Sequence, residues 1–339
     1  MNGLDSPQGR MLELTFVSLV VHRAIYAAAK LGIADLVAEA ARTSDELADA
    51  VNADRDATYR LLRALASAGI LEEHEGRSFS LTDLGTTLRS DIPGSMLGWV
   101  VFSGSPFYLA AWQEVVASIE TGRSAFPAVH GAPFFDYLAD HPEATAIFDA
   151  AMTSLSGWEA KAVVDAYDFG RTRTLVDVAG GQGLLLARIL EANPELRGVL
   201  FDQPQTVPAA QAYLTAAALT ERCDVVAGDF FESVPSGADT YLLKYIVHDW
   251  DDESAIRILT NCRVAMADGG RVLLIETVVP GPEQPDYAKL GDLEMLVLLG
   301  SRERAVAEYD ALLGHAGLAR TRIVPTSEHL KIIEAVAAA

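Results

Sequence analysis

The C-terminal half of the chain contains short apolar runs separated by segments with helical spacing. The apolar runs are 175–178, 198–202, 224–227, 241–243 and 272–275, and the helical segments between them include 184–192 and 254–267. Continuous apolar runs of this length are typical of strands buried on both faces. Their alternation with helices predicts an α/β fold with a doubly wound, mostly parallel sheet. Two last runs, 322–324 and 330–334, are close enough to form a terminal antiparallel hairpin.

The N-terminal region has a different pattern, with apolar residues at helical spacing and two helix starts. Thr43 or Ser44 is suited to cap one helix, because Glu46 follows in its first turn. Asp54 or Asp56 is suited to open the next helix. We therefore expect a mainly helical region between about residues 11 and 90.

A β-hairpin signal follows these two helices. Segments 70–73 and 78–81 alternate around Glu75-Gly76, which completes a winged-helix pattern. Such a module can bind DNA or join two copies of a chain. The second helix carries only three arginines and the formal net charge of the chain is −21, so the protein would repel a phosphate backbone. We predict a homodimerisation module and no nucleic-acid partner.

Residues 93 to 167 are helical in pattern and rich in aromatic side chains. Most of these rings are expected in the core, and a minority can line an apolar pocket for a flat ligand. Phe148 and Met152 are favoured for the pocket because they lie four residues apart on one helical face.

These patterns divide the chain of 339 residues into three predicted parts: a winged-helix domain at 1–92, a helical linker and acceptor-pocket region at 93–170, and an α/β domain at 171–339. Charges and a glycine interrupt the longest apolar-rich segment, 16–36, so we expect no membrane span. Residues 1–10 lack a signal-peptide pattern, which favours a cytoplasmic location.

A glycine turn at the end of the first predicted strand indicates a nucleotide pocket. Gly180, Gly181 and Gly183 follow the strand and precede a helix, where glycine allows a ligand to approach the backbone. Asp202 ends the second strand, where an acid commonly binds ribose hydroxyls. NAD and S-adenosylmethionine both fit this outline, but Leu186 stands where the full dinucleotide fingerprint has a glycine, which disfavours NAD.

One histidine stands out among the seven in the chain. His248 follows the apolar strand 240–245 and begins the sequence His-Asp-Trp-Asp-Asp-Glu. An imidazole beside a nucleotide pocket is suited to take a proton from a substrate hydroxyl near neutral pH. The acids after it are suited to cap and charge the start of the next helix. The other six histidines are expected at the surface or in structural roles.

Taken in order, these segments resemble the S-adenosylmethionine-dependent small-molecule O-methyltransferases of the caffeate and polyketide type. The resemblance is carried by 177–183, 201–204, 228–231, 243–250 and 300–304, and by the winged-helix pattern that is similar to the dimerisation domain of that family. It implies a Rossmann-like, seven-stranded methyltransferase domain. Ala179 departs from the pattern, since a glycine is more usual at that position.

The resemblance also implies roles for individual residues. His248 would be the general base, with Glu276 and Glu303 orienting it. Asp202 would hold the ribose, and Asp229 and Phe230 the adenine. The full set implied for the cofactor is Asp177, Gly180, Gly181, Gly183, Asp202, Gln203, Asp229, Phe230, Lys244, Trp250 and Ser156, and the set for the acceptor is Phe148, Met152, Met295 and Asp249. No metal is expected.

The sequence therefore predicts an enzyme that methylates a hydroxyl of an aromatic small molecule, such as a polyketide or quinone-like secondary metabolite, and releases S-adenosylhomocysteine. Two alternatives stay open: a family member that binds the cofactor but catalyses decarboxylation or hydroxylation, and a winged-helix regulator. The identity of the acceptor and any contribution of a partner chain to the pocket do not follow from the sequence.

Overall fold

The structure, a computed structural model, describes residues 6–338, so the first five residues and Ala339, at the ends of the first and last predicted domains, lie outside it. The described chain forms two compact units. One contains the residues up to Leu109 together with Ala146–Leu155, and the other contains Ala110–Thr145 and the residues from Ser156 onward. Helices α8 (Pro106–Gln113) and α12 (Pro142–Ala166) have residues in both units.

The second unit is built on a seven-stranded sheet with the order β11-β12-β8-β7-β4-β5-β6. Its strands are β4 (Thr174–Val178), β5 (Arg197–Asp202), β6 (Cys223–Ala227), β7 (Thr240–Lys244), β8 (Arg271–Glu276), β11 (Leu318–Pro325) and β12 (Lys331–Ala337). The first five pair in parallel, whereas β12 pairs antiparallel with both β8 and β11. The predicted parallel sheet and terminal hairpin are confirmed.

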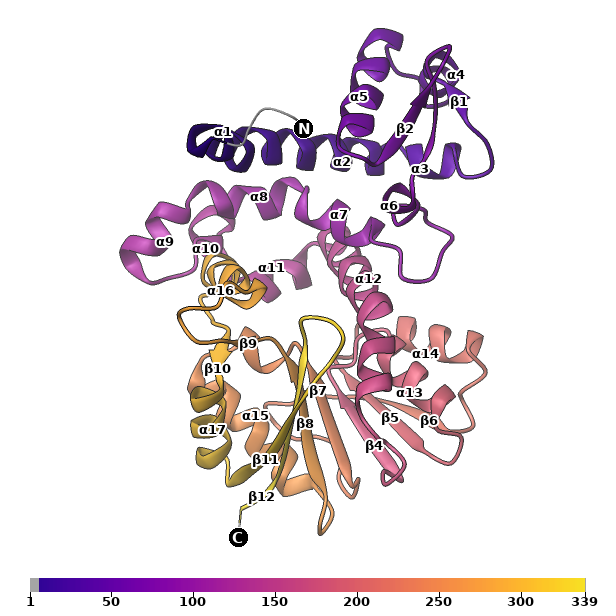
Figure 1. Ribbon diagram of the computed structural model, residues 1–339. Helices are drawn as coiled ribbons and strands as arrows, with labels where there is room; N and C mark the ends of the chain where they lie inside the picture. Colours follow the sequence, from indigo (N-terminus) through magenta and orange to yellow (C-terminus); the bar gives the residue numbers. More distant parts are fainter. Residues whose placement is uncertain (1–5, 339) are drawn as a thin grey trace. The chain divides into compact units, whose positions relative to one another are not determined.

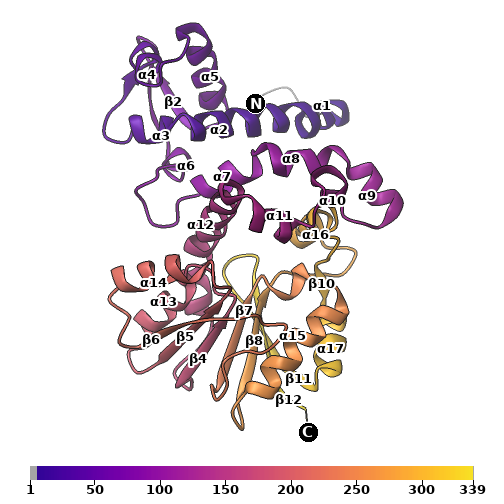
Figure 2. The ribbon, with the colours of Figure 1, turned by 180° about the vertical axis from the view of Figure 1, so that it is seen from behind.

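Helices cover both faces of this sheet (Figures 1 and 2). One face packs against α13 (Leu184–Ala192), α14 (Val207–Ala216) and the C-terminal part of α12. The other face packs against α15 (Asp252–Ala265) and α17 (Val306–His315). Alternate residues of each strand enter opposite layers: Leu242 and Leu273 lie in the first, and Tyr241 and Val272 in the second. Burial on both faces explains why these strands are continuously apolar.

The order in which successive parallel strands are added reverses at β4, because β5 and β6 lie on one side of it and β7 and β8 on the other. The carboxyl end of a parallel sheet at such a switch point is where ligands bind in doubly wound folds. The remaining elements of this unit are α9 (Val115–Thr121), α10 (Phe126–His130), α11 (Phe134–Asp140), η2 (Val247–Asp249), α16 (Tyr287–Leu298), and the paired short strands β9 (Val278–Val279) and β10 (Arg304–Ala305).

The first unit has the predicted winged-helix elements. They are α1 (Pro7–Leu12), η1 (Glu13–Val17), α2 (Ser18–Lys30), α3 (Ile33–Leu36), β1 (Arg42–Thr43), α4 (Ser44–Ala50), α5 (Arg55–Ser67), β2 (Leu71–His74), β3 (Ser78–Leu81), α6 (Asp83–Thr86) and α7 (Leu97–Ser103). Thr43 caps α4 and completes a capping box with Glu46, and Asp54 caps α5 by accepting from the backbone N–H of Ala57.

The helical run from Pro7 to Lys30 exposes an apolar surface. Met11, Leu14, Phe16 and Leu19 are each more than half exposed. By length and composition alone, this run of 24 residues is the one helix in the described chain that would be able to cross a membrane. Exposed apolar surface of this extent marks a place where another surface binds.

Candidate functional site

The glycine turn after β4 has the backbone geometry that its sequence predicts. Gly181 and Gly183 have φ values of 58° and 85°, in the left-handed region that favours glycine. A Cβ on Gly180 would lie 2.6 Å from Oδ2 of Asp177, so a side chain does not fit there. A Cβ on Gly181 would meet no atom within 4 Å, so the backbone of the turn is open on that side. Ala179 has a φ of 56°, which explains why glycine is more usual at this position.

Two acids stand behind this turn. Asp202, at the end of β5, accepts hydrogen bonds from the backbone N–H of Gly181 at 2.8 Å and of Gln203 at 2.7 Å. Burial raises the pKa of the Asp202 carboxyl, and these two donors oppose the shift. Asp177 is buried in β4, and burial together with the charge of Asp202 raises its pKa to about 7 while Lys244 opposes the shift. The carboxylate of Asp202 is therefore a preorganised acceptor beside an open backbone turn, which suits ligand hydroxyls.

An aromatic group follows the third parallel strand. Asp229 turns the chain by accepting from the backbone N–H of Phe231 at 2.8 Å. The ring of Trp250 lies edge-to-face with Phe230, with centroids 5.9 Å apart, and stacks on Phe135 at 5.8 Å. A carboxylate beside rings of this kind suits an adenine, as the sequence predicts for Asp229 and Phe230, with Trp250 predicted to pack near the cofactor.

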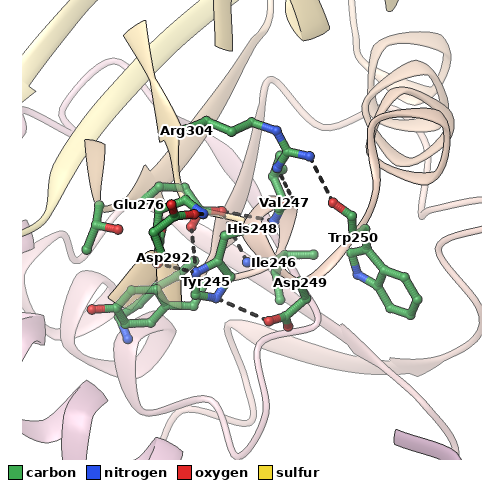
Figure 3. A network of polar contacts seen from close by, with 12 residues as sticks. Tyr245, Ile246, Val247, His248, Asp249, Trp250, Glu276, Asp292 and Arg304 are labelled. Atoms are coloured by element: carbon green, nitrogen blue, oxygen red, sulfur yellow. Dashed lines mark hydrogen bonds and ion pairs between the residues drawn. The ribbon is translucent and has the colours of Figure 1, made fainter. Parts of the chain in front are cut away.

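His248 lies in η2, buried among three carboxyl groups (Figure 3). Its Nδ1 is 2.8 Å from Oε1 of Glu303 and 3.9 Å from Oε2 of Glu276. Its Nε2 faces Oδ1 of Asp249 at 3.3 Å. The three residues predicted as catalytic are therefore in direct contact, and Asp249 lies at the imidazole nitrogen that the glutamates leave open.

The two glutamates reach His248 by different routes. Glu276 ends β8, and its Oε1 accepts from the backbone N–H of Val247 at 2.9 Å, which holds η2 against the strand. Glu303 directly precedes β10, whose pairing with β9 brings it beside the end of β8. The backbone N–H of Glu303 donates to Asp292 of α16 at 3.0 Å. The chain between β9 and β10 thus folds back so that Glu303 contacts the imidazole of His248.

Arg304 supports this loop from the other side. Its guanidinium is buried and donates to the carbonyl of Val247 and to the carbonyl of Trp250, each at 2.8 Å (Figure 3). It also pairs with Asp252 at 2.7 Å. Arg304 was not among the predicted site residues, although its place directly after Glu303 in a segment that resembles the family was a usable signal.

The charges of His248, Glu276 and Asp249 shift one another's pKa values. Burial by itself lowers the pKa of the His248 imidazole, but Asp249, Glu303 and Glu276 oppose it and raise the pKa to about 10. Burial raises the pKa of Glu276 to about 7 and of Asp249 to about 6, against the attraction of His248. The cluster therefore holds a proton tightly on the imidazole while the negative charges around it are present.

A second polar group lies next to His248. Lys244, at the end of β7, pairs with Glu159 at 2.7 Å and donates to Oγ of Ser156 at 3.3 Å. Tyr245 donates to Oε1 of Glu159 at 2.7 Å. Lys244 and Ser156, both predicted to bind the cofactor, are thus brought together, whereas Glu159 and Tyr245 were missed.

The predicted acceptor residues fall in different parts of the structure. Phe148 and Met152 lie in the part of α12 that belongs to the first unit, where the ring of Phe148 lies edge-to-face with Phe102 at 5.8 Å. Met295 is a half-buried residue of α16 in the second unit. Their shared role stays a prediction. Asp249 differs from the other acids of its run, because Asp251 caps α15 and Asp249 instead faces His248.

His248, Glu276 and Glu303 also meet a geometric condition for a metal site, since their ligand atoms lie within 4.8 Å of one another. The short contact between Nδ1 of His248 and Glu303 provides a hydrogen-bonding alternative for the same atoms. The prediction of no metal stays a prediction.

Comparison with known proteins agrees with this arrangement. Residues 112–319 match the model of an O-methyltransferase domain, and residues 13–91 match an O-methyltransferase dimerisation domain. The chain is 44% identical to a phenazine O-methyltransferase of Lysobacter antibioticus over 93% of this chain and 92% of that protein. It is 39% identical to an 8-amino-8-demethylriboflavin N,N-dimethyltransferase of Streptomyces davaonensis over 94% of this chain and 92% of that one.

The fold comparison points the same way. The crystal structure of human N-acetylserotonin methyltransferase in complex with S-adenosylmethionine superposes with a TM-score of 0.92 at 25% identity and full coverage of both chains. The glycine turn and the acids behind it suit that cofactor, and the winged-helix unit corresponds to the dimerisation domain. The chain therefore belongs to the family of S-adenosylmethionine-dependent O-methyltransferases with an N-terminal dimerisation domain.

Proposed function

We propose that this enzyme methylates a hydroxyl group of an aromatic small molecule of secondary metabolism, with His248 as the general base. The observation that carries the proposal is the hydrogen bond between Nδ1 of His248 and Glu303 at 2.8 Å. A carboxylate at Nδ1 fixes the proton on that nitrogen, so the lone pair of the neutral imidazole lies on Nε2. Nε2 is then the atom that accepts the hydroxyl proton.

The carboxyl groups around His248 suit proton transfer from a phenol. A phenol has a pKa near 10, about the value to which Asp249, Glu303 and Glu276 raise the pKa of His248. Transfer between groups of matched pKa costs little free energy. The imidazolium that forms is stabilised by the two glutamates. Because the raised pKa keeps most of the His248 imidazole protonated at pH 7, little of the neutral base is present. We therefore expect faster turnover at higher pH.

The cofactor residues are those around the glycine turn. Gly180, Gly181 and Asp202 present backbone and carboxylate groups for the polar parts of the cofactor, and Phe230 and Trp250 present rings for its base. When bound, the cofactor supplies an activated methyl group on a positively charged sulfur. The protein therefore needs mainly to position the acceptor and to take up its proton.

A second candidate is methylation of an aromatic amine. It is favoured by the likeness to an enzyme named as an N,N-dimethyltransferase at 39% identity. An amine attacks through a free lone pair and loses its proton afterwards, so its methylation depends less on a strong base. The three carboxyl groups around His248 favour the hydroxyl acceptor.

The active form proposed is a cytoplasmic homodimer joined through the dimerisation domain. The apolar residues exposed between Pro7 and Lys30 include Phe16 and Leu19, and this run overlaps the segment 13–91 that matches that domain. A second copy of the chain would bury this surface. Light scattering on the purified protein tests the proposal, and a monomer at micromolar concentration would contradict it.

The test of the proposed function is a panel of phenols, naphthols and hydroxyquinones, each paired with the corresponding aromatic amine, incubated with S-adenosylmethionine. We expect acceptor-dependent release of S-adenosylhomocysteine and a product heavier by one CH2, with hydroxyl acceptors preferred. Products only from the amines would support the second candidate. Saturable cofactor binding without any methylated product across the panel would count against methyl transfer to these acceptors.

A further inference from the structure

Tyr245 contacts the face of the His248 imidazole. The two rings are stacked, with centroids 5.1 Å apart and planes 20° from parallel (Figure 3). The glutamates contact only the edge of the imidazole, through Nδ1. An edge contact at Nδ1 fixes the tautomer, and a contact on the face further restricts rotation of the ring out of its plane.

The backbone at Tyr245 is strained. Its φ is 56°, in the left-handed region that a bulky residue rarely adopts, and its N–H donates to the carbonyl of Ile275 at 3.1 Å. Such strain persists where the surroundings hold the residue in place. Here the turn directs the ring of Tyr245 against the imidazole three residues later.

The far end of Tyr245 is anchored twice. Its hydroxyl contacts Oε1 of Glu159 and Nε2 of His329, each at 2.7 Å. Glu159 is fully buried in α12 and pairs with Lys244 at 2.7 Å, so its negative charge is compensated. His329 lies between β11 and β12, where Trp158 stacks on it at 5.3 Å and Tyr287 contacts it edge-to-face at 4.8 Å. The sequence pattern had suggested only a surface or structural role for His329.

We propose that Tyr245 is a positioning residue for His248: Glu159 and His329 hold its hydroxyl so that its ring fixes the plane of the imidazole and stabilises the imidazolium formed when the base takes a proton. The proposal rests on the proposed role of His248 as general base. An imidazolium over the face of a phenol ring lies within the distance for a cation–π interaction, about 6 Å between the charge and the ring centroid. Donation of the Tyr245 hydroxyl to a carboxylate makes the ring richer in electrons, which strengthens that interaction.

Charged groups also act on His248. Asp249, Glu276 and Glu303 face the imidazole, and Lys244 places its ammonium 4.3 Å from the centroid of the Tyr245 ring. A positive charge on Lys244 disfavours a second positive charge on the imidazole, and the carboxylate of Glu159 compensates the charge of Lys244. Removing Glu159 would therefore disturb both Lys244 and Tyr245. Substitution of Tyr245 itself is therefore the cleaner test.

The experiment compares Tyr245→Phe, which keeps the ring, with Tyr245→Leu, which removes it. The matched control is Tyr59→Phe, because Tyr59 also donates to a glutamate, Glu73 at 3.0 Å, but lies in the first unit. We expect Tyr245→Phe to lower kcat about threefold to tenfold and Tyr245→Leu about tenfold or more, with the cofactor Kd within twofold of wild type. The control should not change kcat.

Two further readouts separate positioning from a general structural role. The pKa of His248, followed by NMR of its ring protons, should fall by about half a pH unit to one unit in Tyr245→Leu, which corresponds to the usual strength of a cation–π contact. In a His248→Gln background, Tyr245→Phe should no longer lower kcat, because the residue acts through the imidazole.

Wild-type kcat and an unchanged His248 pKa in Tyr245→Leu would overturn the proposal, and so would a change confined to cofactor affinity. Failure of the proposed function has a different signature. If His248→Gln alone kept full turnover, the base assignment would fall, while the NMR titration would still report whether Tyr245 stabilises the imidazolium. Calorimetric cofactor binding shows that each variant is folded, and Tyr245→Phe, which keeps the ring, provides the kinetic test if Tyr245→Leu does not fold.

Discussion

Two acidic groups lie at the carboxyl edge of the same sheet and are satisfied in different ways. Around the glycine turn, Asp202 accepts from backbone N–H groups, at 2.7 and 2.8 Å. Around His248, Glu303 and Asp249 face an imidazole, at 2.8 and 3.3 Å. Backbone donors cannot move a proton to or from a ligand, whereas an imidazole can.

The difference fits the proposed division of roles, with ligand binding at the glycine turn and proton transfer at His248. The carboxylate of Asp202 at the turn is a fixed acceptor, and its removal should weaken the binding of a ligand. The carboxyl groups at His248 set how tightly the imidazole holds a proton, and changing them should alter the rate and its pH dependence. Asp202 and the glycine turn are called the binding group, and His248 with Asp249, Glu276 and Glu303 the proton-transfer group. Each variant changes one of these two groups.

The largest expected effect is on the proton-transfer group. His248→Gln removes the only imidazole in it, and we expect kcat to fall about 10²-fold or more while the cofactor Kd stays within about twofold. His315→Gln is the control, because His315 is an exposed residue of α17 that contacts only the backbone of its own helix among the interactions described. Unchanged turnover in His248→Gln would remove His248 from the base role.

The next effect is on the binding group. Asp202→Ala leaves the N–H of Gly181 without its acceptor and removes the predicted ribose contact, so cofactor binding should weaken by about 1–3 kcal/mol. Asp224→Ala is the matched control, since Asp224 is an exposed aspartate on the neighbouring strand β6. Isothermal titration with S-adenosylhomocysteine measures both, and wild-type affinity in Asp202→Ala would place the ribose elsewhere.

Sequence patterns alone predicted the binding group more completely than the proton-transfer group. The glycine turn and Asp202 are local features, because glycine spacing after an apolar strand reports backbone geometry directly. The contacts of His248 are not local: Glu303 is 55 residues away and reaches Nδ1 only because β10 pairs with β9. The role of Glu303 was predicted from the resemblance of the segment 300–304, and no periodic pattern in the chain indicated it.

Tyr245, Glu159 and His329 show what sequence patterns leave out. Glu159 stands in an apolar part of α12 and His329 in a loop, and neither position differs in pattern from a solvated residue. Their association depends on the tertiary arrangement of α12, the end of β7 and the hairpin of β11 and β12. The same holds for the exposed apolar run at Pro7–Lys30, whose spacing predicts a helix but not which surface stays uncovered.

A third prediction concerns the pH dependence of the proton-transfer group. The base works only when neutral, and Asp249, Glu303 and Glu276 raise the pKa of His248 to about 10, so kcat should rise with pH from 6 toward 10. Asp249→Asn removes one of the raising charges, so the rise should occur at lower pH, by about one pH unit.

The control for this shift is Glu253→Gln, which removes one negative charge from an exposed residue at the start of α15. It should leave the pH profile within about 0.2 units, since exposed charges are screened by solvent and salt. Asp249 is also a predicted acceptor contact, so Asp249→Asn is expected to raise the KM of the acceptor as well, and the pH profile is therefore read from kcat. A shift toward higher pH would contradict the charge arrangement described.

The smallest effect is expected at the glycine turn. Ala179 has a φ of 56°, and Ala179→Gly relieves the steric cost of that conformation while giving the unfolded chain more freedom. The two contributions oppose each other, so the free energy of unfolding should change by less than about 1 kcal/mol, and kcat should be unaffected. Urea denaturation measures the first quantity. Asn52, which has a φ of 51° in the other unit, provides the matched comparison through Asn52→Gly. A much larger loss of stability in Ala179→Gly than in Asn52→Gly would mean that the methyl group of Ala179, which packs against the core of the sheet, is needed to hold the binding turn in place.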